Sequence, residues 1–178
     1  MSDLLRVLAA ADQAARWHTD QRRKGAAQEP YINHLLEVAH LVTEATAGLD
    51  PNLAIAALLH DTIEDCGITE AEITDRFGPD VAALVAAVTD DKSLPQAERK
   101  RLQIAHAPKT SDRAKILKLA DKTSNLRAMK ASPPANWPPE RKREYVAWAR
   151  AVVAGTRGAN PWLEAVFDQA AAEADAAV

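Results

Sequence analysis

The sequence predicts an all-α protein, a single domain of about eight to ten helices over residues 1–178. Alanine dominates the apolar residues, with 38 copies against Gly 6, Phe 2, Tyr 2 and Trp 4, and this mixture favours closely packed helices over a sheet. Signals that start and stop helices recur along the whole chain. A chain of this length can also bury a sizeable core.

The first helices are delimited by caps and prolines. Ser2 can cap a helix that runs through about residue 18, and its expected core stripe consists of Leu4, Leu5, Leu8, Ala11 and Ala15. A basic loop over 21–29 leads to a second helix over 34–45. Asp50 and Pro51 then open the most apolar helix, which is expected to continue to Asp65 before Gly67 stops it.

The remaining helices have similar punctuation. Thr69 and Glu72 form a capping box for a short helix that ends at Gly78, and Pro79 and Pro95 each open another. A long helix over 111–129 and two more over 140–154 and 161–172 complete the prediction. The alanine-rich tail from about residue 173 is expected to fray, and no repeat or break in composition indicates a second domain.

Charge and cysteine content exclude several classes of protein. The net charge is −3, so no positive field is expected to attract nucleic acid or an anionic membrane surface. Charged residues at helical spacing in the first 20 positions argue against a signal peptide or a membrane span. Cys66 is the single cysteine, so neither an internal disulfide nor a thiolate zinc site is expected, and the sequence predicts a cytoplasmic protein.

The chemically informative residues are polar ones in apolar helices. His60, Asp61, Glu64 and Asp65 end the most apolar helix. Burying these groups unpaired would cost several kcal/mol, so they require a cation, a partner or water. In a continuous helix, His60 and Glu64 are four residues apart, as are Asp61 and Asp65, and all four would share one broad polar face.

Two more polar residues could complete a metal site. His34 starts the second helix and Asp121 interrupts another apolar stretch. With His60 and Asp61 they form a nitrogen and oxygen ligand set suited to Mn²⁺, Fe²⁺ or Zn²⁺. Each residue alone has a simpler explanation, because a single histidine on an apolar face is usually a hydrogen-bonded core residue.

These residues and their flanking motifs resemble the HD superfamily of metal-dependent phosphohydrolases. Within that superfamily, the sequence most specifically resembles the stand-alone small alarmone hydrolases, which include the metazoan SpoT homologues. These proteins are like the hydrolase half of the RelA/SpoT-type guanosine tetraphosphate enzymes. The resemblance covers about residues 4–164 and is carried by the segments 22–24, 30–34, 58–65, 88–92, 98–101 and 118–126.

The resemblance implies a role for each matching residue. It places the metal ligands at His34, His60, Asp61 and Asp121, and a catalytic acidic doublet at Glu64 and Asp65. The implied substrate contacts are Arg23, Lys24, Asn125, Arg141 and Tyr145. The implied activity is hydrolysis of the 3′-pyrophosphate of guanosine tetra- or pentaphosphate with one Mn²⁺ ion, or with Fe²⁺ or Zn²⁺ in its place.

Other interpretations stay open at this point. A phosphatase that acts on NADPH or another nucleotide would share the metal core, and a non-catalytic nucleotide-sensing domain would keep the fold. Glu64 and Asp65 could be a solvated helix end, although carboxylates there oppose the helix dipole. Arg23 and Lys24 could be surface charges, although guanidinium and ammonium groups in a loop before His34 are suited to phosphate.

Overall fold

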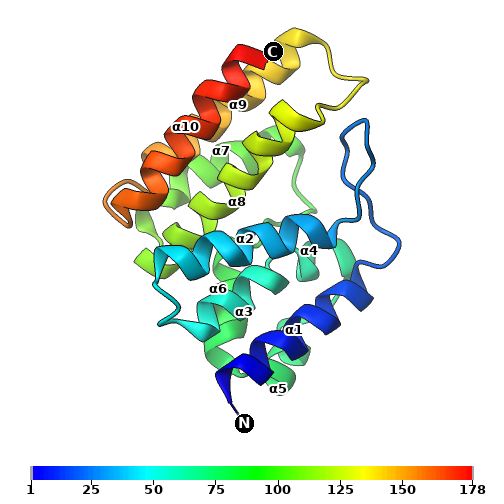
Figure 1. Ribbon diagram of the computed structural model, residues 1–178, viewed down its shortest axis with the longest axis vertical. Helices are drawn as coiled ribbons and strands as arrows, with labels where there is room; N and C mark the ends of the chain where they lie inside the picture. The colour runs from blue at the N-terminus through cyan, green and yellow to red at the C-terminus, as the bar shows by residue number, and fades with distance from the viewer. Residues whose placement is uncertain (1, 178) are drawn as a thin grey trace.

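The computed structural model describes residues 2–177 and confirms the all-α prediction, with ten α-helices and one 3₁₀ helix in that range (Figure 1). The helices are α1 (Asp3–Trp17), α2 (Ile32–Ala45), α3 (Pro51–Leu59), α4 (Thr62–Cys66), α5 (Glu70–Phe77), α6 (Pro79–Val88), α7 (Gln96–His106), η1 (Ala107–Lys109), α8 (Asp112–Ala131), α9 (Pro139–Ala154) and α10 (Pro161–Ala177).

Helix α8 lies at the centre of the bundle, between α2 on one side and α10 on the other (Figure 1). It also contacts α6 and α9, while α3 packs between α1, α2 and α6. Phe167 is the largest fully buried side chain of the core, and leucines supply most of the others, among them Leu35, Leu53, Leu58 and Leu117. The central helices therefore hold any polar group they carry in a fixed, largely dry position.

The predicted core stripe of α1 is wrong for its three leucines, although Ala11 does pack against the core. Leu4, Leu5 and Leu8 are exposed by 69, 53 and 57%, whereas Ala10 and Ala14 are fully buried. The two alanines face the apolar core, and small side chains allow helix backbones to approach closely. The choice between the two faces depended on packing partners that the pattern within one helix does not reveal.

The predicted continuous helix over 51–65 is also wrong, because it is broken between α3 and α4. His60 and Asp61 lie in the turn between them. The His60 side chain donates from Nδ1 to the Ala57 carbonyl, 2.8 Å away, and so competes for an acceptor that a continuing helix would use for the Asp61 amide. The break turns both residues toward α8 at a helix end.

The expected fraying of the tail does not occur, because α10 continues through Ala177. Ala174 is fully buried, and the carboxylates of Glu173 and Asp175 form ion pairs with Lys130 of α8 and Arg150 of α9. The tail is helical because one face of alanines packs on neighbouring helices.

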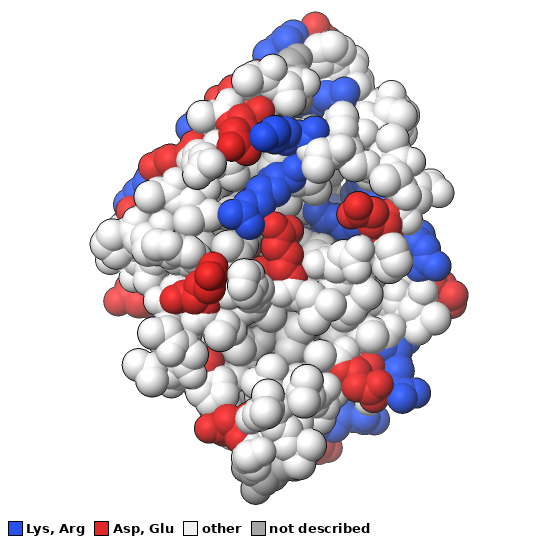
Figure 2. All heavy atoms as spheres, viewed as in Figure 1, with Lys and Arg blue, Asp and Glu red and all other residues white. Residues whose placement is uncertain are grey.

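None of the helices within residues 2–177 is long and apolar enough to cross a membrane. On the face seen in Figure 2, basic and acidic side chains lie beside each other, and no patch of a single charge covers it. This agrees with the small net charge of the sequence.

The loop between α1 and α2 lies against the loop that follows α8. An isolated bridge joins Arg22 to Pro30 and closes the first loop, and the Ala27 amide donates to Ser132 Oγ at 2.9 Å. A Cβ added to Gly25 would lie 2.0 Å from the Ser132 carbonyl oxygen. The two loops therefore approach so closely that only glycine fits at this position.

Candidate metal centre and adjoining cavities

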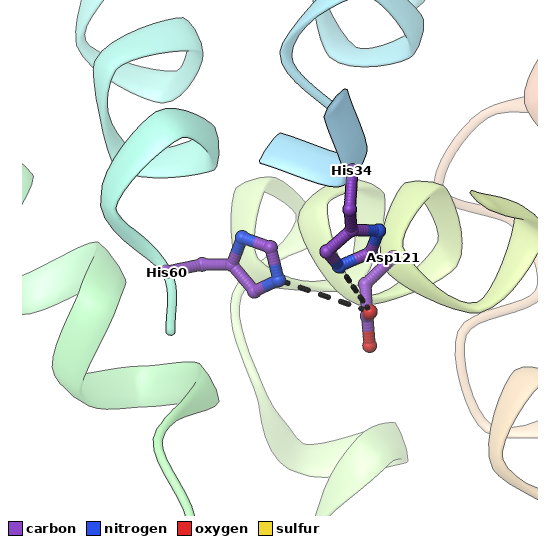
Figure 3. Close-up of side chains that lie close together, drawn as sticks. All are labelled: His34, His60 and Asp121. Carbon is purple, nitrogen blue, oxygen red and sulfur yellow. Dashed lines mark ion pairs between the residues drawn. The ribbon is translucent and has the colours of Figure 1, made fainter. Parts of the chain in front are cut away.

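The side chains of His34 from α2, His60 after α3 and Asp121 from α8 lie close together and point toward one another (Figure 3). The Asp121 Oδ1 atom lies 3.5 Å from His34 Nε2 and 3.8 Å from His60 Nε2. Both imidazoles are buried, and one ligand atom from each of the three residues fits within 4.8 Å of the others. The cluster thus has the size and the donor types of a metal site.

Hydrogen bonds fix the orientation of both imidazoles. Ser124 Oγ donates to Glu37 Oε2 at 2.7 Å and lies 2.8 Å from His34 Nδ1, so the hydroxyl is left to accept from that nitrogen. His60 Nδ1 donates to the Ala57 carbonyl. In both rings Nδ1 therefore carries a hydrogen, so Nε2 is the nitrogen that faces the cluster and that would coordinate a cation in its deprotonated form.

Asp61 is the fourth predicted ligand and lies beside the two imidazoles. Its Oδ2 atom is 3.2 Å from His60 Nε2 and 3.7 Å from His34 Nε2. The same oxygen accepts a hydrogen bond of 2.5 Å from the Tyr31 hydroxyl. The structure thus brings all four predicted ligands together and adds Tyr31, which orients the Asp61 carboxylate.

The electrostatics of the cluster favour a positive charge at its centre. Burial opposes a charged His60, but the carboxylates of Asp61 and Asp121 outweigh it and raise the pKa of His60 to about 10. Burial likewise opposes a charged Asp121, yet Lys122 and the two imidazoles hold the pKa of that carboxyl well below its usual range. A bound cation would meet the same two carboxylates.

The residues present fit a divalent metal ion. His60 Nε2 is buried and forms no well-aligned hydrogen bond, although Asp61 Oδ2 lies 3.2 Å away, and such an atom is rare in a folded protein. Two imidazole nitrogens and two carboxylates form a hard to borderline donor set, and no sulfur lies among them. His34, His60, Asp61 and Asp121 would together hold the ion.

A cavity of about 190 Å³ opens beside the cluster and is here called the metal cavity. Glu64 lines it, accepts a hydrogen bond from the Asp90 amide, and has a pKa raised by burial. Two lysines of α8, Lys118 and Lys122, lie on another wall. The cavity therefore places a carboxyl and two ammonium groups next to the candidate metal ligands.

Lys122 is an unusually buried cation. Its Nζ atom donates to Asp121 Oδ2 at 3.0 Å and lies 4.4 Å from the centre of the Trp148 ring. The ion pair leaves Asp121 Oδ1 directed at the two imidazoles. Lys122 thus holds the Asp121 carboxylate in position and neutralises part of its charge.

A larger cavity of about 320 Å³, the aromatic cavity, lies between the loop before α2 and the segment after α8. Its walls include Tyr31, Trp137 and Tyr145, and it shares Tyr31 and Asn125 with the metal cavity. Arg23 donates to Asn125 Oδ1 at 2.9 Å. An aromatic cavity edged by a guanidinium is suited to a nucleobase and its phosphates.

The five predicted substrate contacts are distributed unevenly around this cavity. Arg23, Lys24, Asn125 and Tyr145 line it. Arg141 is exposed, and its guanidinium carbon lies 4.4 Å from the ring centre of Trp137, a residue of the cavity wall. Arg141 therefore reaches the cavity only through that ring.

The acidic doublet is divided between the two cavities. Glu64 lines the metal cavity, whereas Asp65 lines the aromatic cavity, where it accepts from Gln21 Nε2 at 2.7 Å and pairs with Lys92. Residues adjacent in sequence leave a helix about 100° apart, so the two carboxylates point to different places. The predicted polar face over 60–65 is therefore not a single surface.

The sequence interpretation missed several residues of the site. They include Tyr31, Lys122 and Ser124, which form hydrogen bonds with the predicted ligands Asp61, Asp121 and His34, respectively. Lys122 and Ser124 were detectable in principle, because both lie within one helical turn of Asp121 in the sequence. Trp137 gave no signal, since it follows two prolines in a loop.

Residues 10–149 match the family model described as HD domain. This match covers more than half of the chain, so the protein belongs to the HD domain family, and the predicted resemblance is confirmed.

Similar proteins of known name place the chain more specifically within this family. The proteins named guanosine-3′,5′-bis(diphosphate) 3′-pyrophosphohydrolase MESH1 from Xenopus tropicalis and Homo sapiens are 49 and 48% identical to this chain. The alignments cover 94 and 92% of this chain and 93 and 91% of those proteins. Within the HD domain family, the chain therefore belongs to the family of these MESH1 proteins.

Solved structures agree with this placement. A structure described as a metazoan orthologue of SpoT that hydrolyses ppGpp is 43% identical, covers 93% of both chains and superposes with a TM-score of 0.89. A protein from Listeria monocytogenes is 28% identical, covers 80% of this chain and 99% of that one, and has a TM-score of 0.68.

Proposed function

We propose that this protein hydrolyses the 3′-diphosphate of guanosine 3′,5′-bis(diphosphate), and of the corresponding pentaphosphate, to GDP or GTP and pyrophosphate. One observation carries the proposal: the cluster of candidate metal ligands lies at the junction of a polar and an aromatic cavity, in a chain that is 49% identical to a named hydrolase of this compound. The ligand classes suited to the two cavities, a phosphate at a metal and a nucleobase on aromatic rings, belong to one nucleotide.

The reaction is a transfer of the diphosphate group to water. A water oxygen forms a bond to the phosphorus that carries the ribose 3′ oxygen, and the bond from that phosphorus to the ribose breaks. The water loses a proton, the ribose oxygen gains one, and pyrophosphate leaves with its bridge intact. When bound, a divalent ion would make a water molecule more acidic and neutralise charge on the phosphoryl oxygens.

The side chains of this protein have separable roles in that reaction. Glu64 has a pKa raised by burial, so its carboxyl can hold or release a proton beside the metal cavity. Asp65, the other member of the doublet, would act from the aromatic cavity through the groups it holds there, Gln21 and Lys92. Arg23, Lys24, Asn125 and Tyr145 would bind the nucleoside and its 5′ phosphates, with Arg141 closing the rim through Trp137.

We also propose the identity of the metal ion and the cellular compartment of the protein. His34, His60, Asp61 and Asp121 would hold Mn²⁺, with Fe²⁺ or Zn²⁺ as the alternatives that the same donors accept. A cytoplasmic location is proposed because Cys66 is a free thiol, which suits a reducing compartment.

The test is a panel of nucleotides incubated with the Mn²⁺-loaded protein, with products identified by mass. We expect one pyrophosphate per GDP from guanosine tetraphosphate and no orthophosphate. The Glu64→Gln variant, which keeps the shape of the side chain, serves as the control and should turn over at least about 10²-fold more slowly. Release of orthophosphate alone, or a higher kcat/KM for NADPH than for guanosine tetraphosphate, would show that the proposed substrate is wrong. Binding of the nucleotide without any turnover would indicate a sensing domain.

A further inference from the structure

A third cavity, of about 210 Å³, lies between α7 and α8 and is here called the α7 cavity. It shares five lining residues with the metal cavity, namely Val88, Asp90, Arg99, Gln103 and Lys118. Because the metal cavity also shares residues with the aromatic cavity, the metal cluster stands between the other two. The three cavities form a series with the reaction site in the middle.

The wall between the α7 cavity and the metal cavity contains two buried polar atoms without hydrogen-bond partners. They are Nε of Arg99, a donor, and Oε1 of Gln103, an acceptor. The amide nitrogen of Gln103 donates to the Asp90 carboxylate, which fixes the direction of the unpaired oxygen. Unpaired buried groups are costly, so this wall keeps one donor and one acceptor that a polar ligand would satisfy.

Lys118 adds unused hydrogen-bonding capacity at the same place. Its Nζ atom donates to the Val88 carbonyl at 3.0 Å, which uses one of its three hydrogens. Burial and the nearby charge of Lys122 lower the pKa of Lys118. An anion beside Lys118 and Arg99 would offset this repulsion, although the carboxylates of Asp90 and Glu64 limit how tightly it is held.

We propose that the α7 cavity binds the terminal phosphate of the 3′-diphosphate and then the pyrophosphate product, through Arg99 and Lys118 as donors. Gln103 Oε1 would accept from a protonated phosphate oxygen. This inference rests on the proposed function. With the nucleoside in the aromatic cavity and the scissile phosphorus at the metal cluster, the phosphate beyond it extends toward the α7 cavity. A 3′-monophosphate would leave these donors unused, so the cavity would select for a diphosphate.

The test compares Arg99→Gln and Lys118→Gln with Arg101→Gln. Arg101 is a matched control because it is on the same helix, pairs with Glu98 and has a side chain that is 64% exposed. Binding of inorganic pyrophosphate and of GDP to the Mn²⁺-loaded protein is measured by calorimetry, with Mn²⁺ in excess so that pyrophosphate does not strip the site. Loss of a charged hydrogen bond should weaken pyrophosphate about 10-fold or more in each test variant, while GDP and the control are unchanged.

A second readout is the ratio of kcat/KM for guanosine tetraphosphate to that for guanosine 5′-diphosphate 3′-monophosphate. The ratio should fall in both test variants and stay constant in the control. Equal pyrophosphate affinity in all proteins would overturn the proposal, as would parallel losses of pyrophosphate and GDP, which indicate general damage. A different outcome would separate the two proposals. If the parent protein binds pyrophosphate but does not hydrolyse the tetraphosphate, and only the test variants lose pyrophosphate binding, the anion site stands and the proposed function fails.

Discussion

Replacing Ser124 by alanine should weaken metal binding without touching a ligand atom. The serine hydroxyl accepts a hydrogen bond from His34 Nδ1 at 2.8 Å and donates one to Glu37 Oε2 at 2.7 Å. Without it, the buried imidazole loses the partner that places the hydrogen on Nδ1 and the lone pair on Nε2. The Glu37 carboxylate keeps one support, because Arg127 holds its other oxygen at 3.0 Å.

The magnitude follows from the arrangement. Groups that orient a metal-bound histidine typically contribute 10- to 100-fold to metal affinity, which corresponds to about 1.4–2.7 kcal/mol. An unpaired buried N–H costs a similar amount, roughly 1–3 kcal/mol, so the metal-free variant should also unfold at a lower temperature. Glu37→Gln should have a smaller effect on affinity than Ser124→Ala, because an amide oxygen can still accept from the Ser124 hydroxyl.

Metal affinity is measured by competition with a chromogenic chelator, and stability by thermal unfolding of the metal-free proteins. Ser93 lies in the loop before α7 and is exposed, so the Ser93→Ala variant is the control for the loss of a hydroxyl in both measurements. Metal affinity of Ser124→Ala within about twofold of the parent would refute the argument that this contact orients His34.

Three further predictions concern other parts of the molecule. Gly25→Ala should raise KM for the nucleotide and leave kcat nearly unchanged in steady-state kinetics, because the added Cβ, 2.0 Å from the Ser132 carbonyl, must displace the loop. Lys122→Met should lower the unfolding free energy in urea by about 3 kcal/mol, since it leaves the Asp121 charge buried without its ion pair. Burial raises the pKa of Cys66 from 9.0 to about 11, so a smaller fraction of this thiol is ionised at pH 8. Iodoacetamide should therefore react with Cys66 about 100-fold more slowly in the folded protein than in the urea-unfolded chain, and equal rates would contradict this prediction.

Helix boundaries and polar residues in apolar helices were the predictable part of this protein. The caps at Ser2, Asp50 and Thr69 all accept the expected backbone hydrogen bonds, because capping depends on residues within one turn. The four candidate ligands meet because a buried polar group needs a partner wherever it lies.

The unpredicted part depended on contacts between distant segments. The exposed face of α1 followed from the fit of Ala10 and Ala14 to the core, which no pattern within α1 encodes. The break at His60 followed from one side-chain hydrogen bond to the Ala57 carbonyl. A helical period predicts a face but not which local contact interrupts it, and that interruption placed His60 and Asp61 outside the helix that carries Glu64 and Asp65.

The packing of α10 has a consequence for how loss of function can arise. This helix contributes no residue to the three cavities, yet it packs more extensively on α8 than on any other helix. Its buried alanines support the helix that carries Asp121, Ser124 and Asn125. A premature stop codon that removed α10 would leave every coding triplet of the site intact and still disable the protein, so a survey of alleles limited to site residues would overlook it.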